Sequence, residues 1–145
     1  MKNLVLLAQT DTTVGFLSQD AAKLQAIKQR HSDKPFLKVY ASLRAFKTDH
    51  AHVPSRYKSM LRRAKKMTFI SKNQAFRIVY DTAHNRLLQR FSFMYSTSAN
   101  QSGHPYHKEF CSRNSDIIVQ DGRGLFEGEP SRIIKLGKKA QRRLR

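Results

Sequence analysis

The chain of 145 residues is long enough for one domain with a buried core, and 28 Lys and Arg against 10 Asp and Glu give it a net charge of +18. No apolar run reaches the roughly eighteen residues of a membrane-spanning helix, so we expect no membrane partner. The single cysteine, Cys111, excludes an internal disulfide, and with no recognisable leader peptide it favours a cytoplasmic protein.

Apolar residues recur with period two in some segments and period 3.6 in others, which predicts alternating strands and helices. We expect strands at residues 3–8, 35–40, 67–71, 75–80, 90–95, 116–120 and 131–136. We expect helices at residues 19–29, 42–47, 54–64, 82–90 and 106–113, with Ser18 capping the first. Polar loops are expected at residues 10–15 and 121–130. The pattern predicts a single domain of the α/β class.

Several common catalytic motifs are missing from the sequence. It has no GxxxxGK[ST] phosphate loop, and the glycines of residues 121–130 lack the spacing of a dinucleotide fingerprint. Two histidine pairs, His50 with His52 and His104 with His107, lack the cysteine or carboxylate companions of a zinc site. No GxSxG supports a serine nucleophile. We therefore expect no metal site in the protein, and chemistry that rests on hydroxyls, amides and cations.

Three polar clusters carry such groups. Residues 9–15 (QTDTTVG) follow the first strand, and residues 96–105 (STSANQSGHP) follow the strand expected at 90–95. Residues 27–35 (IKQRHSDKP) place Lys28 and Arg30 at a helix end with Lys34 just beyond. The helix dipole alone explains one or two cations there, whereas three that converge on one loop better suit a polyphosphate.

Basic residues are concentrated in two stretches without acids. The first lies within residues 50–80 and includes Arg62, Arg63, Lys65 and Lys66, and the second follows Glu129. Such fields attract polyanions, and RNA is the foremost candidate for a cytoplasmic protein. A solvated basic face is the alternative interpretation of the same charges.

In their order along the chain, these clusters resemble the motifs of the YrdC/Sua5/YciO family, the threonylcarbamoyl-AMP synthases. The family pattern contains T-[DE]-T-x-x-G, then K-x-R, then S-T-S-A-N-x-S-G-x-P, and a late P-S-x-I. The matching residues are 10–12 with Gly15, Lys28 and Arg30 with 34–35, 96–105, and 130–133. Residues 67–70 and 75–78 are similar to its T-x-x and V-R-V strands. The resemblance covers nearly the whole chain and implies a YrdC-like fold, a single-domain twisted mixed sheet with flanking helices.

The resemblance also implies an activity. The family makes threonylcarbamoyl-AMP from L-threonine, bicarbonate and ATP, for the N6-threonylcarbamoyl modification of adenosine 37 in tRNA. By position, the threonine-binding residues would be Thr10, Thr12, Arg77, Ser96 and Ser131, with Arg77 on the carboxylate. The ATP-binding residues would be Lys28, Arg30, Ser98, Asn100 and a C-terminal arginine, Arg143 or Arg145. ATP is then a substrate that arrives with Mg²⁺, no tightly bound cofactor is expected, and no side chain acts as a nucleophile.

The chain departs from the family pattern in several places. Gln9 and His31 stand where the pattern has prolines, residues 63–66 replace a W-P-G-P turn, and the segment before the first strand is mostly missing. Residues 1–145 are therefore expected to be an N-terminally shortened YrdC-like domain with a basic C-terminal tail at about 137–145. Three functions stay open: the synthase, a catalytically degenerate protein that binds double-stranded RNA or tRNA, and a helper with protein partners in tRNA modification.

Overall fold

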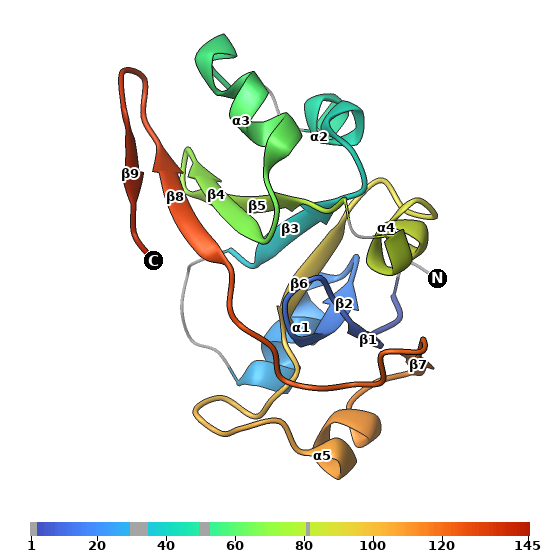
Figure 1. Cartoon of the computed structure of the whole chain (residues 1–145). Coiled ribbons are helices and arrows are strands. Elements are labelled where there is room, and N and C mark those ends of the chain that lie inside the picture. Colours follow the sequence, from blue (N-terminus) through green and yellow to red (C-terminus); the bar gives the residue numbers. More distant parts are fainter. Residues whose placement is uncertain (1–2, 30–34, 50–52, 81) are drawn as a thin grey trace.

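The computed structural model describes residues 3–29, 35–49, 53–80 and 82–145 (Figure 1). The strands are β1 (Leu6–Gln9), β2 (Val14–Ser18), β3 (Leu37–Tyr40), β4 (Met67–Ser71), β5 (Gln74–Ile78), β6 (Met94–Ser98), β7 (Ile117–Val119), β8 (Arg132–Leu136) and β9 (Gln141–Arg143). The helices are α1 (Ala21–Lys28), α2 (Leu43–Asp49), the short 3-10 helix η1 (Ser55–Tyr57), α3 (Lys58–Arg63), α4 (Thr82–Leu88) and α5 (Lys108–Arg113). No helix in these described ranges is both long and apolar enough to cross a membrane.

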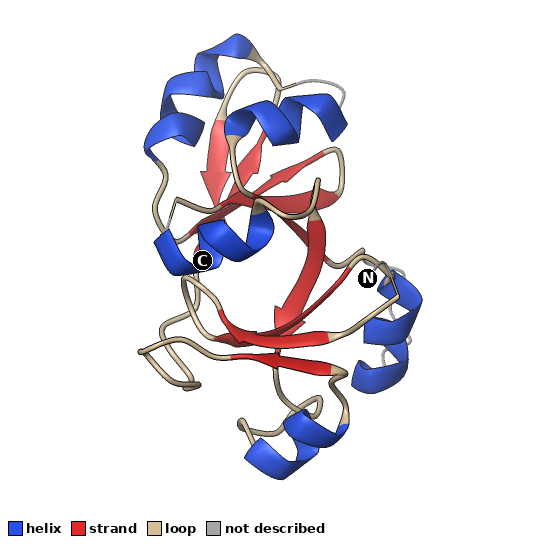
Figure 2. Cartoon of the chain, turned by 90° about the vertical axis from the view of Figure 1, so that its right-hand side faces the viewer, coloured by secondary structure: helices blue, strands red, loops and turns tan. Residues whose placement is uncertain are grey.

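The strands form one mixed sheet in the order β7-β1-β2-β6-β3-β5-β4-β8-β9. The pairs β1 with β7, β3 with β5, and β4 with β8 are parallel, and the other neighbours are antiparallel. Figure 2 shows that the sheet is strongly twisted, with helices packed around it. The single-domain α/β fold with a twisted mixed sheet and flanking helices is thereby confirmed.

Apolar side chains on both faces of the sheet explain why helices flank it. Strand β1 is buried on both faces, as its continuous apolar run predicts. Leu7 packs in one cluster with Leu24 of α1, whereas Leu6 packs in another with Leu88 of α4. A third cluster lies beneath α2 and α3, where Phe46 packs over the β5 side of the sheet.

Three local predictions were wrong. Residues Val14–Ser18 form β2, because their backbone pairs with β1 on one side and β6 on the other, which a short run containing glycine did not indicate. Helix α1 is capped by Asp20, whose carboxylate accepts the Ala22 N–H at 3.0 Å, whereas Ser18 ends β2. The strand expected at 90–95 lies at Met94–Ser98, so the cluster of residues 96–105 begins inside a strand.

The expected C-terminal tail is partly a strand. Residues Gln141–Arg143 form β9, which turns back and pairs antiparallel with β8. This strand is exposed along its whole length and contributes no apolar side chain to the core, so its hydrophobicity did not predict it. The return of the chain nevertheless decides where the last residues lie, because it brings the C-terminal Arg145 back alongside Ile133 of β8 (Figure 1).

Candidate functional site

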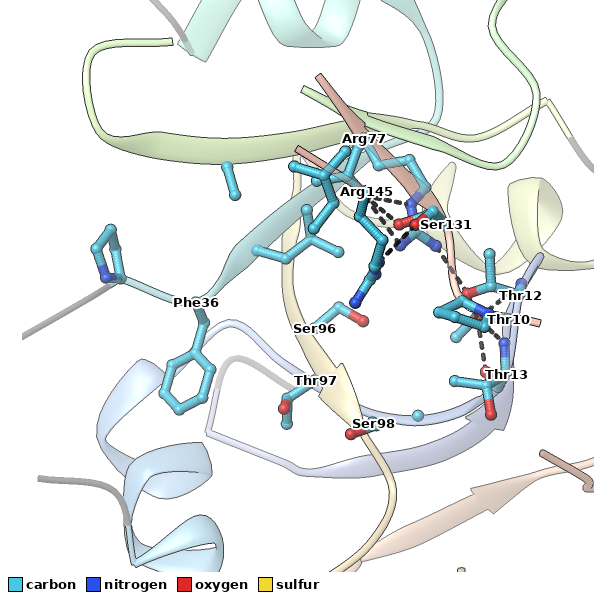
Figure 3. Close-up of a pocket in the computed structure, with 17 residues that line it drawn as sticks. Thr10, Thr12, Thr13, Phe36, Arg77, Ser96, Thr97, Ser98, Ser131 and Arg145 are labelled. Atoms are coloured by element: carbon cyan, nitrogen blue, oxygen red, sulfur yellow. Dashed lines mark hydrogen bonds between the residues drawn. The ribbon is translucent and has the colours of Figure 1, made fainter. Parts of the chain in front are cut away.

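A cavity of about 380 Å³ opens on the sheet, lined by residues from six of its strands and from the loops that join them. Its polar lining consists almost entirely of hydroxyl groups and two arginines. These residues are Thr10, Thr12, Thr13, Thr68, Ser96, Thr97, Ser98, Ser131, Arg77 and Arg145 (Figure 3). Phe36, Leu37 and Ile133 add an apolar part of the wall. A concave site with a few converging polar groups is the usual form of a small-molecule site.

Arg77 is the central cation of the cavity and is held in one orientation. The residue is 7% exposed, and its Nη1 donates to Asp11 Oδ1 at 2.7 Å and to Thr12 Oγ1 at 3.0 Å. Its Nε and Nη2 both donate to Thr68 Oγ1, at 3.2 and 3.1 Å. These four bonds use four of the five N–H groups of a guanidinium. A rigid, buried cation of this kind is suited to hold the carboxylate of a ligand.

Asp11 balances the charge of Arg77 from behind the cavity. Both side chains are 8% exposed, so solvent screens the ion pair poorly. Burial by itself raises the pKa of the Asp11 carboxyl, but the adjacent His84 ring and the Arg77 charge outweigh it and lower the pKa below its ordinary 3.8. Asp11 therefore stays ionised at neutral pH, and the pair keeps Arg77 in place without a ligand.

The threonine loop after β1 is folded around the Thr10 hydroxyl. Thr10 Oγ1 donates to the Thr13 carbonyl at 2.6 Å and accepts the N–H groups of Thr12 and Thr13 at 3.2 and 3.3 Å. Hydroxyl-centred turns of this type explain why threonines are gathered at this strand end. The loop thereby presents Thr12 to Arg77 and leaves Thr10 and Thr13 on the cavity wall.

A second segment, residues 121–130, fastens this loop from outside, and the sequence had assigned it no role. The Val14 N–H donates to the Phe126 carbonyl at 3.0 Å, and the Phe126 N–H donates to Gln9 Oε1 at 2.9 Å. The Gly128 N–H donates to Thr13 Oγ1 at 3.2 Å. Gln9, which departs from the family's proline, therefore has a structural role as the acceptor for this segment.

The end of β6 is held by the predicted phosphate-binding lysine. Lys28 Nζ donates to the carbonyls of Ser98 and Asn100 at 3.0 and 2.9 Å, and to Asn100 Oδ1 at 2.7 Å. Ser98 Oγ also donates to Asn100 Oδ1 at 2.7 Å. Lys28 is 8% exposed and does not line the cavity. Its positive charge lies next to Ser98, so it would stabilise an anion bound at this end of β6.

The structure brings together most of the residues that the sequence singled out. The cavity is lined by Thr10, Thr12, Arg77, Ser96, Ser98, Ser131 and Arg145. Lys28 and Asn100 lie beside Ser98, while Arg143 is exposed on β9 and does not line the cavity. The predicted RNA-binding residues Arg62, Arg63, Lys65 and Lys66 are exposed on and just after α3, outside the cavity. Arg30 lies outside the described residues.

Thr68 is the main cavity residue that the sequence interpretation missed. It contacts Arg77 because β4 and β5 pair with Phe69 opposite Phe76, and continuing this register places Thr68 beside Arg77. The turn consists of Lys72 and Asn73, both with positive φ, as in a two-residue hairpin of type I′. The strands expected at 67–71 and 75–80 leave a three-residue loop at 72–74. A loop of that length shifts the pairing of the two strands by one residue, so Thr68 would not lie opposite Arg77.

The described residues that line the cavity are hydroxyls, arginines and apolar side chains rather than the usual ligands of a resident metal. Among the described residues, no three His, Cys, Asp or Glu side chains lie close enough to share an ion. Asp11, which lies between the cavity residues Thr10 and Thr12, is engaged with Arg77. Hydroxyls and arginines fit an anionic ligand.

Comparisons with known proteins agree with this architecture. The Sua5/YciO/YrdC family model, described as "Telomere recombination", matches residues 2–145. No curated protein matches the sequence. The fold is similar to P. abyssi Sua5 complexed with L-threonine (18% identity, TM-score 0.74, covering 98% of this chain and 50% of that chain). It is similar to E. coli YciO (18%, 0.75, covering 98% and 82%) and to full-length HypF in its phosphate- and nucleotide-bound form (15%, 0.75, covering 98% and 26%).

The extent of these matches differs between relatives. The chain spans about half the length of the Sua5 structures that it matches, and most of the length of YciO. At these identities the solved structures show a shared fold. The family model covers nearly every residue, and the described motif residues Thr10, Ser98 and Ser131 line the cavity. The chain belongs to the Sua5/YciO/YrdC family.

Proposed function

We propose that this protein is a threonylcarbamoyl-AMP synthase, which makes threonylcarbamoyl adenylate from L-threonine, bicarbonate and ATP for the N6-threonylcarbamoyl modification of tRNA. The observation that carries the proposal is the buried, oriented Arg77 in a cavity lined by hydroxyls, with Arg145 also on its wall. A similar structure, Sua5, has been solved with L-threonine, and another, HypF, in a nucleotide-bound form.

In the proposed reaction the threonine amino group first condenses with bicarbonate, and water leaves as the carbamate forms. A carbamate oxygen then attacks the α-phosphorus of ATP, and the bond from that phosphorus to the departing pyrophosphate breaks. No side chain becomes covalently linked, so the protein contributes positioning and charge neutralisation. Mg²⁺ bound to ATP supplies further neutralisation of the phosphates.

In this proposal we assign each side chain a role that is compatible with its position. Arg77 holds the threonine carboxylate, with Thr10, Thr12, Ser96 and Ser131 around the amino acid. The nucleotide lies toward Ser98, where the charge of Lys28 is close. Arg145, which lines the cavity and whose Nε donates to the Ser131 carbonyl at 2.9 Å, neutralises the reacting phosphates in this proposal.

The decisive test is pyrophosphate release by the purified protein with ATP, bicarbonate and threonine. We expect release that requires both threonine and bicarbonate. The variant Ser96→Ala, which removes a cavity hydroxyl, should lower kcat/KM for threonine by about tenfold, the loss of one hydrogen bond. Ser59→Ala, on an exposed part of α3, is the control and should leave it unchanged. Release that proceeds equally well without threonine would contradict the proposal.

A second candidate function, RNA binding, is favoured by a separate observation. The two acid-free stretches come together in space, because Tyr57 Oη donates to the Gly137 carbonyl at 2.6 Å and Arg56 donates to the Lys139 carbonyl. Residues 53–66 carry six Lys and Arg, residues 130–145 carry seven, and neither stretch has an acid. The helix η1, which directly precedes α3, is thus in contact with the β8–β9 hairpin. We infer that the cations of α3 and of this hairpin form one basic surface outside the cavity, which is suited to a phosphate backbone and compatible with the synthase.

RNA binding is tested by matched charge removal. Alanine at Arg62, Arg63, Lys65 and Lys66 should weaken binding of a double-stranded RNA or a tRNA. It should also make the slope of log K against log salt shallower by about three. The control removes four exposed cations from α4, α5 and the residues near them: Arg86, Arg90, Lys108 and Arg113. An equal loss of RNA affinity in both variants would show that only the net charge matters and would contradict a dedicated RNA-binding surface.

A further inference from the structure

Thr68 joins Arg77 to a second cavity residue by hydrogen bonds. Its Oγ1 accepts from Nε and Nη2 of Arg77 and lies 2.8 Å from Ser131 Oγ. Thr68 is 5% exposed and Ser131 is 3% exposed. Three side chains from β4, β5 and the segment just before β8 thus form a continuous chain, Arg77–Thr68–Ser131, along the wall of the cavity. Its two ends, Arg77 and Ser131, are labelled in Figure 3.

The chemistry of the hydroxyl decides the direction of each bond in this chain. A threonine hydroxyl has one hydrogen to donate and two lone pairs that accept. The two N–H groups of Arg77 are directed at the Thr68 oxygen, and the positive guanidinium turns the hydroxyl hydrogen away from itself. Ser131 Oγ, at 2.8 Å, takes that hydrogen. Ser131 then accepts from Thr68, and its own hydrogen is left to donate to whatever occupies the cavity.

We propose that Thr68 is a positioning residue for the amino-acid substrate: it transmits the orientation of Arg77 to Ser131, so that the Ser131 hydroxyl donates to the substrate carboxylate. The inference rests on the proposed function and deepens it, since it names how the site selects a carboxylate. Arg77 and Ser131 together then form a two-point donor for one anion. Hydrogen bonds to an ionised acceptor are roughly twice as strong as neutral ones, so the arrangement favours an acid over its amide.

The experiment compares binding of L-threonine and L-threoninamide by calorimetry, because the two differ only at the carboxylate. Thr68→Val keeps the shape of the side chain and removes both hydrogen-bonding functions. We expect it to lower threonine affinity by about tenfold and threoninamide affinity by less than about threefold. Thr68→Ser, which keeps the hydroxyl, should restore the preference. The control is Ser71→Ala, a buried hydroxyl on the same strand that does not line the cavity, and it should not change the preference.

A double-mutant cycle then tests whether Thr68 acts through Ser131. If it does, Ser131→Ala and Thr68→Val will each reduce the preference for threonine over threoninamide, and the double variant will be no worse than Ser131→Ala alone. Should Thr68→Val fail to fold by circular dichroism, Thr68→Ala serves the same cycle. An unchanged preference in a folded Thr68 variant would overturn the inference while leaving the synthase intact. If the unaltered protein does not bind threonine, the proposed function fails, and the inference with it.

Discussion

Gly128 lies in the segment that fastens the threonine loop, and alanine at this position should disturb both stability and binding. An added Cβ would stand 1.9 Å from the Thr12 carbonyl oxygen and 3.1 Å from its carbon. Real Cβ atoms essentially never approach another heavy atom more closely than 3.0 Å, so the two backbones must separate by more than 1 Å. The obstacle is main chain, and no side-chain rotation can relieve it.

Overpacking of this kind costs about 1–3 kcal/mol, and we expect the upper part of that range. For a chain of 145 residues each kcal/mol lowers the Tm by about 3 °C, which gives a fall of roughly 6–9 °C. Because the Thr12 hydroxyl oxygen accepts a hydrogen bond from Arg77 Nη1, moving Thr12 should also weaken threonine binding. Calorimetric unfolding and threonine titration measure the two effects.

The matched control for this prediction lies in the same segment. An added Cβ at Gly122 would meet no atom within 4 Å, and Gly122→Ala should change the free energy of unfolding by less than about 0.5 kcal/mol. If Gly128→Ala unfolds at the same temperature as Gly122→Ala and binds threonine equally well, then residues 121–130 do not hold the loop, and the reasoning is refuted.

Three further predictions concern the charged groups. Asp11→Asn leaves the buried Arg77 without its counter-ion and should cost about 3 kcal/mol at pH 7. Because the folded-state pKa of Asp11 is lowered, the carboxyl stabilises the fold above its ordinary pKa of 3.8, and this contribution is lost as the pH falls through the lower folded value. Urea unfolding from pH 2 to 7 should therefore show that the free energy of unfolding falls less toward low pH in the variant than in the unaltered protein. Parallel plots of this free energy against pH would contradict the prediction. Arg145→Ala should weaken ATP binding by at least about tenfold, whereas Arg143→Ala should change it less than twofold, as measured by nucleotide titration. Lys28→Met leaves three oxygens at the end of β6 without their cation. It should lower the free energy of unfolding by about 2 kcal/mol and weaken ATP binding. An unchanged free energy of unfolding would show that the cation is dispensable.

Periodicity located most of the elements because their apolar faces are buried. It failed where backbone pairing alone made a strand. Strand β2 exists because β1 and β6 flank it, and β9 exists because β8 has a free edge, although β9 has no apolar side chain. The cap of α1 was placed two residues early because Ser18 and Asp20 are both good capping residues, and only the end of β2 decides between them.

Residue types and their order were enough to predict the α/β class, the family and the polar clusters, because these depend on local chemistry. Which groups share a cavity depended on strand register and chain reversal, which local patterns do not encode. Leu144 and Arg145 both donate their N–H groups to the Ile133 carbonyl, and this irregularity at the end of β9 interrupts the two-residue alternation. Arg145 therefore lines the cavity while Arg143, two residues earlier, faces solvent. The pairing of β4 with β5 likewise placed Thr68 against Arg77, a contact set by the register of two strands rather than by either sequence alone.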